Sequence, residues 1–363
     1  MKRNLIRTAA AFFAAVLLYP GTGNAVSAER AILVDGQTGR VMYEKRADEQ
    51  SLIASTTKIM TALIVCQQCN VLDRMVIPKE AVGIEGSSMY LQEGEVLTIQ
   101  ELLYGMMLSS GNDAAVALAI YCGGTVEGFV ERMNDKARML RLTNTQFANP
   151  HGLDAPGHYS SARDLAVLTQ YAMENPIFAQ TVGTKNVRVT NRSLKNHNKL
   201  LWQLEGADGV KTGFTKAAGR ILVSSAVRQG RRVICVTIHA PNDWADHKQL
   251  YDRAFSRYTP TRIVAAGACM GQLAVFGGNE NAVTVTAVED FSYSLAEGEE
   301  ITFVLSKKEF VYAPIASGAD AGYAYVCIDG KPVGKVKVVY NQTIEQSVSK
   351  KKSFWERLLG DQT

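Results

Sequence analysis

The chain has 363 residues, with 39 Lys or Arg against 35 Asp or Glu, so its formal net charge is +4. The near balance of the two signs excludes the strongly basic surface of a nucleic-acid-binding protein. The length exceeds what a single compact core usually holds, so we expect two domains.

The first residues have the features of a secretory signal. Three cations precede an apolar run at 9–19, and a Pro-Gly break and small residues follow it. We expect a signal peptide at 1–28, cleaved after Ala25 or Ala28, and an exported protein. An uncleaved anchor is less favoured because the run is short for a membrane-spanning helix. Removing 1–28 takes away three cations and no acids, which lowers the charge from +4 to +1.

The region 29–258 contains strands at both ends and helices between them. This order predicts an α+β domain in which helices flank an antiparallel sheet. The expected strands are 31–34, 41–44, 219–227 and 231–239, the last two forming a hairpin; the expected helices begin near Ser55 and cover 99–121 with a break at 109–112, 126–141, 162–174 and 243–257.

The remainder of the chain differs in character. Short β-like runs at 283–287, 301–305, 324–328 and 333–339, separated by Gly-rich and Asp-Gly turns, predict a small all-β domain over 259–345. In the tail, 346–363, three lysines precede a helical face formed by Phe354, Trp355, Leu358 and Leu359. The tail could lie on an anionic membrane as a peripheral anchor, or it could be a frayed terminus, since so short a helix is marginal alone.

Candidate metal ligands are few. The Cys66-x-x-Cys69 spacing resembles half a zinc site, but no second such pair follows, so buried apolar roles are favoured. His151 and His158 flank Asp154 in a Gly/Pro-rich segment without a third ligand at helical spacing. We expect no metal and no cofactor. The six cysteines leave any disulfide connectivity open.

The stretch SLIASTTKIMTALIV, 51–65, raises a physical question. Lys58 lies one helical turn after Ser55, at the head of an apolar run that indicates a buried helix. A buried lysine is unfavourable unless it is paired or has a chemical role. Two polar triplets follow, Ser110-Gly111-Asn112 and Lys211-Thr212-Gly213. Each triplet alone is a weak signal, whereas all three motifs in this order form a strong one.

The three motifs, in the forms ASTTK, SSGND and DGVKTGFT, resemble the signatures of penicillin-binding proteins and serine β-lactamases. The stretches GSSMYLQEGE, ANPHGLDAPGHYSSARDLA and NHNKLL further resemble the low-molecular-mass D-alanyl-D-alanine carboxypeptidases, over 29–258. The resemblance implies a β-lactamase/transpeptidase-like fold and a location at the outer face of the cytoplasmic membrane or in the cell wall. It also implies removal of the terminal D-alanine from peptidoglycan pentapeptides through an acyl-enzyme on Ser55, and β-lactam antibiotics as covalent inhibitors.

The serine–lysine pair has a physical rationale. A serine hydroxyl is a poor nucleophile unless a nearby base takes its proton. Lys58 can be that base if burial and the second cation Lys211 lower its pKa and keep it uncharged.

The resemblance implies further roles. Ser110 would relay a proton between Lys58 or Lys211 and the leaving amine, and Asn112 would hold the substrate's amide and orient Lys58. Lys211 and Thr212 would bind the terminal carboxylate, with Gly213 permitting close approach. The oxyanion hole would be the backbone N–H groups of Ser55 and Phe214.

Three alternatives are weighed. A class A β-lactamase needs a deacylating glutamate, and none occurs between Glu131 and Glu174. A D,D-endopeptidase would use the same residues and stays open. A non-catalytic wall-binding protein is disfavoured because the motifs are complete. We expect Asp113 to pair locally, and His197, His239 and His247 to be packing or surface residues.

Overall fold

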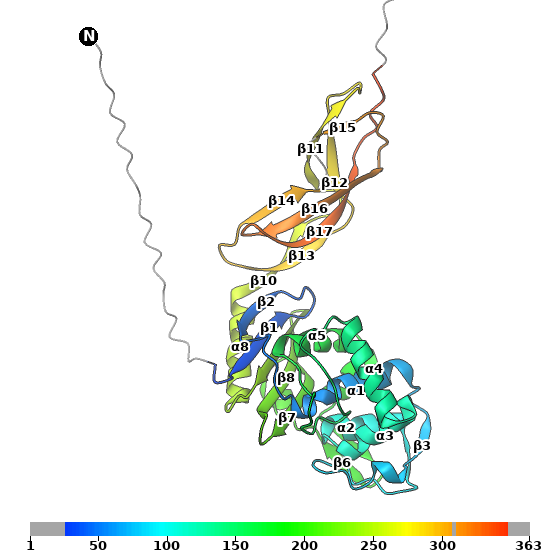
Figure 1. Cartoon of the computed structure of the whole chain (residues 1–363). Coiled ribbons are helices and arrows are strands. Elements are labelled where there is room, and N and C mark those ends of the chain that lie inside the picture. The colour runs from blue at the N-terminus through cyan, green and yellow to red at the C-terminus, as the bar shows by residue number, and fades with distance from the viewer. Residues whose placement is uncertain (1–25, 307–309, 348–363) are drawn as a thin grey trace, which may run out of the picture.

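The computed structural model describes residues 26–306 and 310–347, in two parts (Figure 1). The N-terminal part combines a sheet with helices, and the C-terminal part is built of strands, as the sequence predicted. Most of the predicted signal peptide and most of the predicted amphipathic tail lie outside the described residues. Within them, no single helix is long and apolar enough to cross a membrane, although one bent pair, Asn112–Gly123 with Val126–Met139, passes by length and composition.

A five-stranded sheet forms the centre of the first domain. Its order is β2-β1-β9-β8-β7, and every neighbouring pair is antiparallel. The predicted hairpin and the two early strands are confirmed. The strand β7 was not predicted, and it contains the Lys211-Thr212-Gly213 motif at one edge of the sheet. The strands are β1 Arg30–Asp35, β2 Val41–Lys45, β7 Ala207–Thr215, β8 Gly219–Arg228 and β9 Arg231–Ile238.

Helices cover both faces of this sheet (Figure 1). Because side chains alternate along a strand, Ile32 and Val34 of β1 pack in the larger core with α1 to α6. Ala31 and Leu33 pack instead in a second core with α7 and α8. The helices are α1 Lys58–Gln68, α2 Ile99–Leu108, α3 Asn112–Gly123, α4 Val126–Met139, α5 Ala162–Met173, α6 Pro176–Gly183, α7 Leu200–Gln203 and α8 Asp243–Arg257.

Several short elements were not expected from the sequence. They are the hairpin of β3 Arg74–Val76 with β4 Val96–Thr98, the hairpin of β5 Asn186–Val189 with β6 Arg192–Lys195, the helix α6, and the single turns η1 Ala54–Thr57 and η2 Lys79–Ala81. The strands and turns of three or four residues carry too little periodicity to be recognised, and α6 has only eight residues.

The second domain is a six-stranded sheet with a two-stranded ribbon. The sheet order is β14-β16-β17-β12-β11-β15, and β10 pairs with β13 in the ribbon. All four predicted strands are present, within β12, β14, β16 and β17. The strands are β10 Tyr258–Val264, β11 Cys269–Phe276, β12 Ala282–Ala287, β13 Phe291–Ala296, β14 Ile301–Leu305, β15 Phe310–Tyr312, β16 Asp320–Ile328 and β17 Lys331–Tyr340.

Arg40 connects the two domains. Its guanidinium forms an ion pair with Glu299 and lies over the rings of Tyr258 and Tyr293, 4.8 and 5.1 Å from their centroids. Beside it, Ser294 Oγ donates a hydrogen bond of 2.6 Å to a carboxylate oxygen of Asp35. These partly buried contacts give the domains a specific polar junction.

Candidate active site

Ser55 lies on the short turn η1, immediately before α1. Ala54, which precedes it, has a φ of +44°, a left-handed conformation that is rare outside glycine. Two glycines lie in close contact with this turn. A Cβ on Gly152 would lie 1.9 Å from the Ala54 carbonyl oxygen, and one on Gly213 would lie 3.3 Å from the Ser55 nitrogen. Ser55 is therefore held in a strained turn by two segments distant in sequence.

Lys58 is the first residue of α1, and its side chain is fully buried. Its Nζ lies 3.0 Å from Ser55 Oγ. It also donates hydrogen bonds of 2.6 Å to Asn112 Oδ1 and 2.6 Å to the His151 carbonyl oxygen. The lysine thus has polar partners in three directions, one of which is the serine hydroxyl.

Two effects lower the pKa of Lys58 well below 10.5. Burial is the larger cause, because it removes water from the charged form, and the positive charge of Lys211 adds to it. The negative charge of Asp113 opposes both. Burial therefore favours the uncharged form of Lys58, which is the direction that the apolar run around it predicted.

Asn112 begins α3 and joins the lysine to a neighbouring loop. Its Oδ1 accepts from Lys58, while its Nδ2 donates a hydrogen bond of 2.6 Å to the Glu85 carbonyl. Asp113 beside it accepts from Ser88 Oγ at 2.6 Å and from two backbone N–H groups of the same loop. Asp113 pairs locally, as expected, and its hydrogen bonds hold the loop that contains Ser88 in place.

Ser110 and Lys211 form a second polar contact. Ser110 has a φ of +62°, and its Oγ accepts a hydrogen bond of 3.1 Å from Lys211 Nζ. The same Nζ donates to the Thr212 carbonyl at 2.9 Å. Lys211 is 1% exposed, and its burial lowers its pKa to about 7. Its charge can therefore change near neutral pH.

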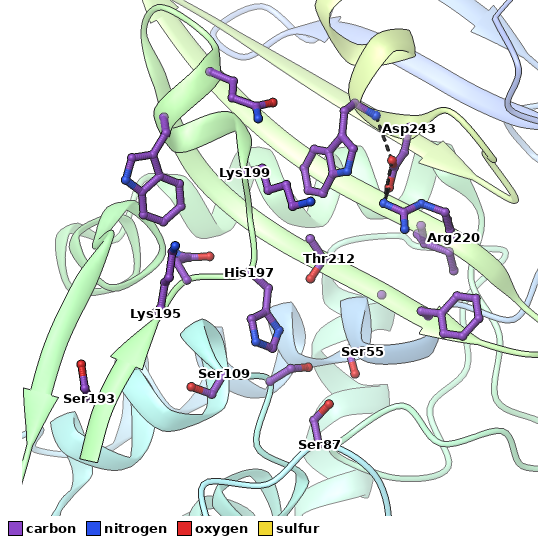
Figure 2. Close-up of a pocket in the computed structure, with 18 residues that line it drawn as sticks. Ser55, Ser87, Ser109, Ser193, Lys195, His197, Lys199, Thr212, Arg220 and Asp243 are labelled. Atoms are coloured by element: carbon purple, nitrogen blue, oxygen red, sulfur yellow. Dashed lines mark hydrogen bonds and ion pairs between the residues drawn. The ribbon is translucent and has the colours of Figure 1, made fainter. Parts of the chain in front are cut away.

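The predicted site residues converge on one cleft of about 1010 Å³. Its lining includes Ser55, Ser110, Thr212, Gly213 and Phe214. Figure 2 shows Ser55 and Thr212 at this hollow. The remaining three, Lys58, Asn112 and Lys211, are buried next to the lining serines.

The cleft has a further wall that sequence reasoning missed. His197 lines it: the residue is exposed, as a surface residue was expected to be, but it faces the cleft, which the sequence did not indicate. Burial and the charge of Lys211 lower the pKa of His197. Its position in the stretch NHNKLL, which resembles the carboxypeptidases, could have indicated that His197 lies near the site. The same wall carries Lys199 and Trp202.

Arg220 and Trp244 extend the cleft on the side of α8, and Figure 2 shows Arg220 next to Asp243. Asp243 accepts two hydrogen bonds of 2.9 Å from the Arg220 guanidinium, which fixes its position. No pattern along the chain links β8 to the start of α8, so this pair could not be predicted.

The two histidines considered as metal ligands have other partners. His158 Nδ1 accepts from the Ala148 N–H at 2.9 Å, and its Nε2 lies 2.7 Å from Thr57 Oγ1. Burial lowers the pKa of His158 to about 4 and that of His151 to about 4. Both rings are neutral near pH 7. No cluster of three metal-binding side chains occurs among the described residues.

A serine paired with a buried lysine, in a domain built on a helix-flanked antiparallel sheet, is the arrangement of the penicillin-recognising serine enzymes, which react through an acyl-enzyme intermediate. Residues 19–242 match the D-alanyl-D-alanine carboxypeptidase family, and residues 258–346 match the C-terminal domain of penicillin-binding protein 5. The chain therefore belongs to the D-alanyl-D-alanine carboxypeptidase family of serine peptidases.

Individual relatives agree with this assignment. The chain is 32% identical to the D-alanyl-D-alanine carboxypeptidase DacF of Bacillus subtilis, over 93% of this chain and 90% of that protein. Penicillin-binding protein 5 of Haemophilus influenzae has a similar structure, with a TM-score of 0.77, 29% identity, and coverage of 90% of this chain and 99% of that one. A mutant form of the Streptomyces K15 DD-transpeptidase aligns with a TM-score of 0.63 and 33% identity, over 64% of this chain and 100% of that one.

Proposed function

We propose that this protein removes the terminal D-alanine from peptidoglycan pentapeptides through an acyl-enzyme on Ser55. The observation that carries the proposal is the 3.0 Å contact between Lys58 Nζ and Ser55 Oγ. A neutral amine has two N–H groups and one lone pair. If the two N–H groups donate hydrogen bonds to Asn112 and to the His151 carbonyl, the lone pair can accept the proton of the Ser55 hydroxyl.

Acylation then proceeds as follows. Ser55 Oγ attacks the carbonyl carbon between the last two D-alanines, and Lys58 takes the hydroxyl proton. The backbone N–H groups of Ser55 and Phe214 stabilise the oxyanion. As the C–N bond breaks, Ser110, hydrogen-bonded to Lys211, gives its proton to the leaving amine and receives in return the proton that Lys58 took from Ser55, so that Lys58 is neutral again. Water later attacks the ester, returns a proton to Ser55 and releases the tetrapeptide.

The substrate is bound by residues of the edge strand β7 and by Asn112 at the start of α3. Thr212 and Lys211 bind the terminal carboxylate, and Gly213 leaves room for the peptide backbone beside β7. A bound carboxylate favours the charged form of Lys211 and so raises its pKa from about 7. Asn112 orients Lys58 and contacts the substrate's amide.

The direct test is digestion of a synthetic pentapeptide ending in D-Ala-D-Ala, followed by mass spectrometry. We expect release of one D-alanine per peptide and covalent labelling of the protein by fluorescent penicillin. Ser55→Ala should abolish both, with a change in unfolding free energy within about 0.5 kcal/mol. Absence of D-alanine release by the folded wild-type protein would refute the proposal.

The same preparation separates the alternatives. Cleavage of cross-linked muropeptides in preference to pentapeptides would assign a D,D-endopeptidase. Hydrolysis of many penicillin molecules per site would assign a β-lactamase.

We further propose that the protein is exported and touches the membrane through its basic tail, 346–363. Ser27 and Ala28 are bound to the Asp246 carboxylate through their backbone N–H groups, which favours signal cleavage after Ala25 rather than after Ala28. N-terminal sequencing of the mature protein tests the cleavage site. Co-sedimentation with anionic vesicles, compared with a chain ending at 347, tests the tail.

A further inference from the structure

Three aromatic side chains meet at one edge of the second domain. Phe276 ends β11, and Phe310 and Tyr312 belong to the edge strand β15. Their ring centroids lie 5.4, 5.9 and 6.1 Å apart, and the three residues are 54%, 41% and 71% exposed in that order. Single apolar residues are common on a protein surface, whereas three large exposed rings in mutual contact form a patch that indicates an interaction site. We call this patch the aromatic tip.

The register of the two strands explains why all three rings face outward. In the parallel pair of β11 with β15, Val275 lies opposite Val311, and Phe276 lies opposite Tyr312. Val275 is buried in the core of the second domain, and Val311 packs against that core. Because side chains alternate along a strand, the residues on either side of the two valines point away from the core. The aromatic tip is therefore the outer face of these strands, and Phe310 belongs to it for the same reason.

The chain leaves the described structure beside the aromatic tip. The N–H of Ser347 donates a hydrogen bond of 2.8 Å to the carbonyl of Gly277, and Gln346 forms a bridge with Gly278. Lys350, the first of three consecutive lysines, follows Ser347 by three residues, which span at most about 11 Å. Figure 1 shows β11 and β15 at the end of the second domain that lies away from the first domain. The basic tail therefore starts next to the exposed rings.

The charges at this end of the domain do not themselves attract an anionic surface. Glu280 and Glu345 are both exposed there, and the Glu280 carboxylate accepts a hydrogen bond of 2.5 Å from Gln342. The attraction has to come from the lysines of the tail, while the rings supply apolar area. Aromatic side chains, tyrosine in particular, are favoured at the boundary between lipid headgroups and acyl chains.

We propose that the aromatic tip inserts into the headgroup layer of an anionic membrane, as a second contact beside the basic tail. This inference rests on the membrane contact of the tail proposed above. If the lysines lie on the headgroups, the short connection from Ser347 leaves Phe276, Phe310 and Tyr312 at the same surface. The second domain then contacts the membrane through its far end, and the first domain with its cleft is held away from the lipid (Figure 1).

The test is co-sedimentation of the full-length protein with vesicles of phosphatidylcholine and phosphatidylglycerol. The tip variant carries Phe276→Ser and Tyr312→Ser. The matched control carries Phe303→Ser and Tyr325→Ser, which are 44% and 39% exposed and lie on β14 and β16, at the opposite edge of the sheet. We expect the partition coefficient to fall about tenfold in the tip variant and to stay within about twofold in the control. Added salt should weaken the wild type and the tip variant by the same factor, because the lost contact is apolar.

A second variant guards against a folding defect. Tyr312→Ser alone changes the most exposed of the three residues and should lower the partition coefficient by about threefold. Release of D-alanine from a soluble pentapeptide should be unchanged in all the variants, since none of these residues lines the cleft. That assay therefore reports on the proposed activity independently of the membrane contact.

Three results would overturn the inference. Vesicle binding of both tip variants equal to that of the wild type, with binding lost in a chain ending at 347, would assign the whole contact to the tail. Slower tryptic cleavage at Lys350 in the wild type than in the tip variant, without vesicles, would show that the tail itself covers the rings. Failure of the wild-type chain to bind the vesicles would remove both membrane contacts and leave the peptidase activity untouched.

Discussion

Replacing Lys211 by methionine should make the protein more stable at pH 7 while it destroys activity. Lys211 is 1% exposed, and burial lowers its pKa from 10.5 to about 7. The unfolded chain therefore binds a proton that the folded chain holds only weakly. A depressed lysine pKa opposes folding most strongly below pH 7, and its effect fades as pH rises towards 10.5.

The magnitude follows from the two pKa values. At 1.36 kcal/mol per pH unit, the weakened proton binding opposes folding by about 4 kcal/mol at pH 7 and by about 1.4 kcal/mol at pH 9.5. Methionine removes this term. It also removes the hydrogen bonds to Ser110 Oγ and the Thr212 carbonyl, at about 1 kcal/mol each. The variant should be about 2 kcal/mol more stable than wild type at pH 7 and slightly less stable at pH 9.5.

The assay is urea unfolding of both proteins at pH 7 and pH 9.5, with penicillin labelling in parallel. Labelling should fall at least about 100-fold for two reasons. The positive charge of Lys211 no longer lowers the pKa of Lys58, and Ser110 loses its hydrogen-bond partner. Lys199→Met, at an exposed cleft lysine, is the matched control and should change stability by less than about 0.5 kcal/mol at both pH values. A stability difference that does not vary with pH, or a loss of stability at pH 7, would refute the reasoning.

Three further predictions concern other parts of the molecule. Arg40→Ala removes the ion pair to Glu299, so small-angle scattering should show a wider range of domain orientations, with cleavage of a soluble pentapeptide unchanged within about twofold. His158 should contribute a loss of about 3 kcal/mol as pH drops from 6.5 to 4, because the unfolded state protonates it while the folded state, with a pKa of about 4, does not; His158→Gln should reduce the pH dependence in acid denaturation curves by that amount, while His151 and His247 keep their shares. Asn112→Ala frees Lys58 from one acceptor, so penicillin acylation measured by stopped flow should slow by about 100-fold, and an unchanged rate would contradict the orienting role.

Much of the fold could be predicted because its signals are local. The hairpin of β8 and β9 is two apolar runs with a short turn, and the buried helix α1 is an unbroken apolar stretch. The edge strand β7 could not be predicted in this way, because its Gly, Lys and Thr residues lack the apolar alternation of a strand. These residues serve the cleft rather than the core.

The cleft's outer wall shows the same limit. Arg220 is held by Asp243, 23 residues further along the chain. Residues of the cleft wall need to be polar and partly exposed, which is also the pattern of an ordinary surface loop. Their role becomes visible only when the sheet brings β8 and the start of α8 to one side of the serine.

The sequence alone determined the pairing of Ser55 with Lys58, because a spacing of three residues at a helix start places two side chains on one face. It also determined the order of the three motifs and the two-domain division into mixed and all-β parts. Only the tertiary structure decided what surrounds the lysine. Its two other hydrogen-bond partners come from 54 and 93 residues away, and the partner of Ser110 comes from 101 residues away. Such contacts depend on strand order and helix packing, which set the burial that lowers a pKa and which periodicity along a chain does not encode.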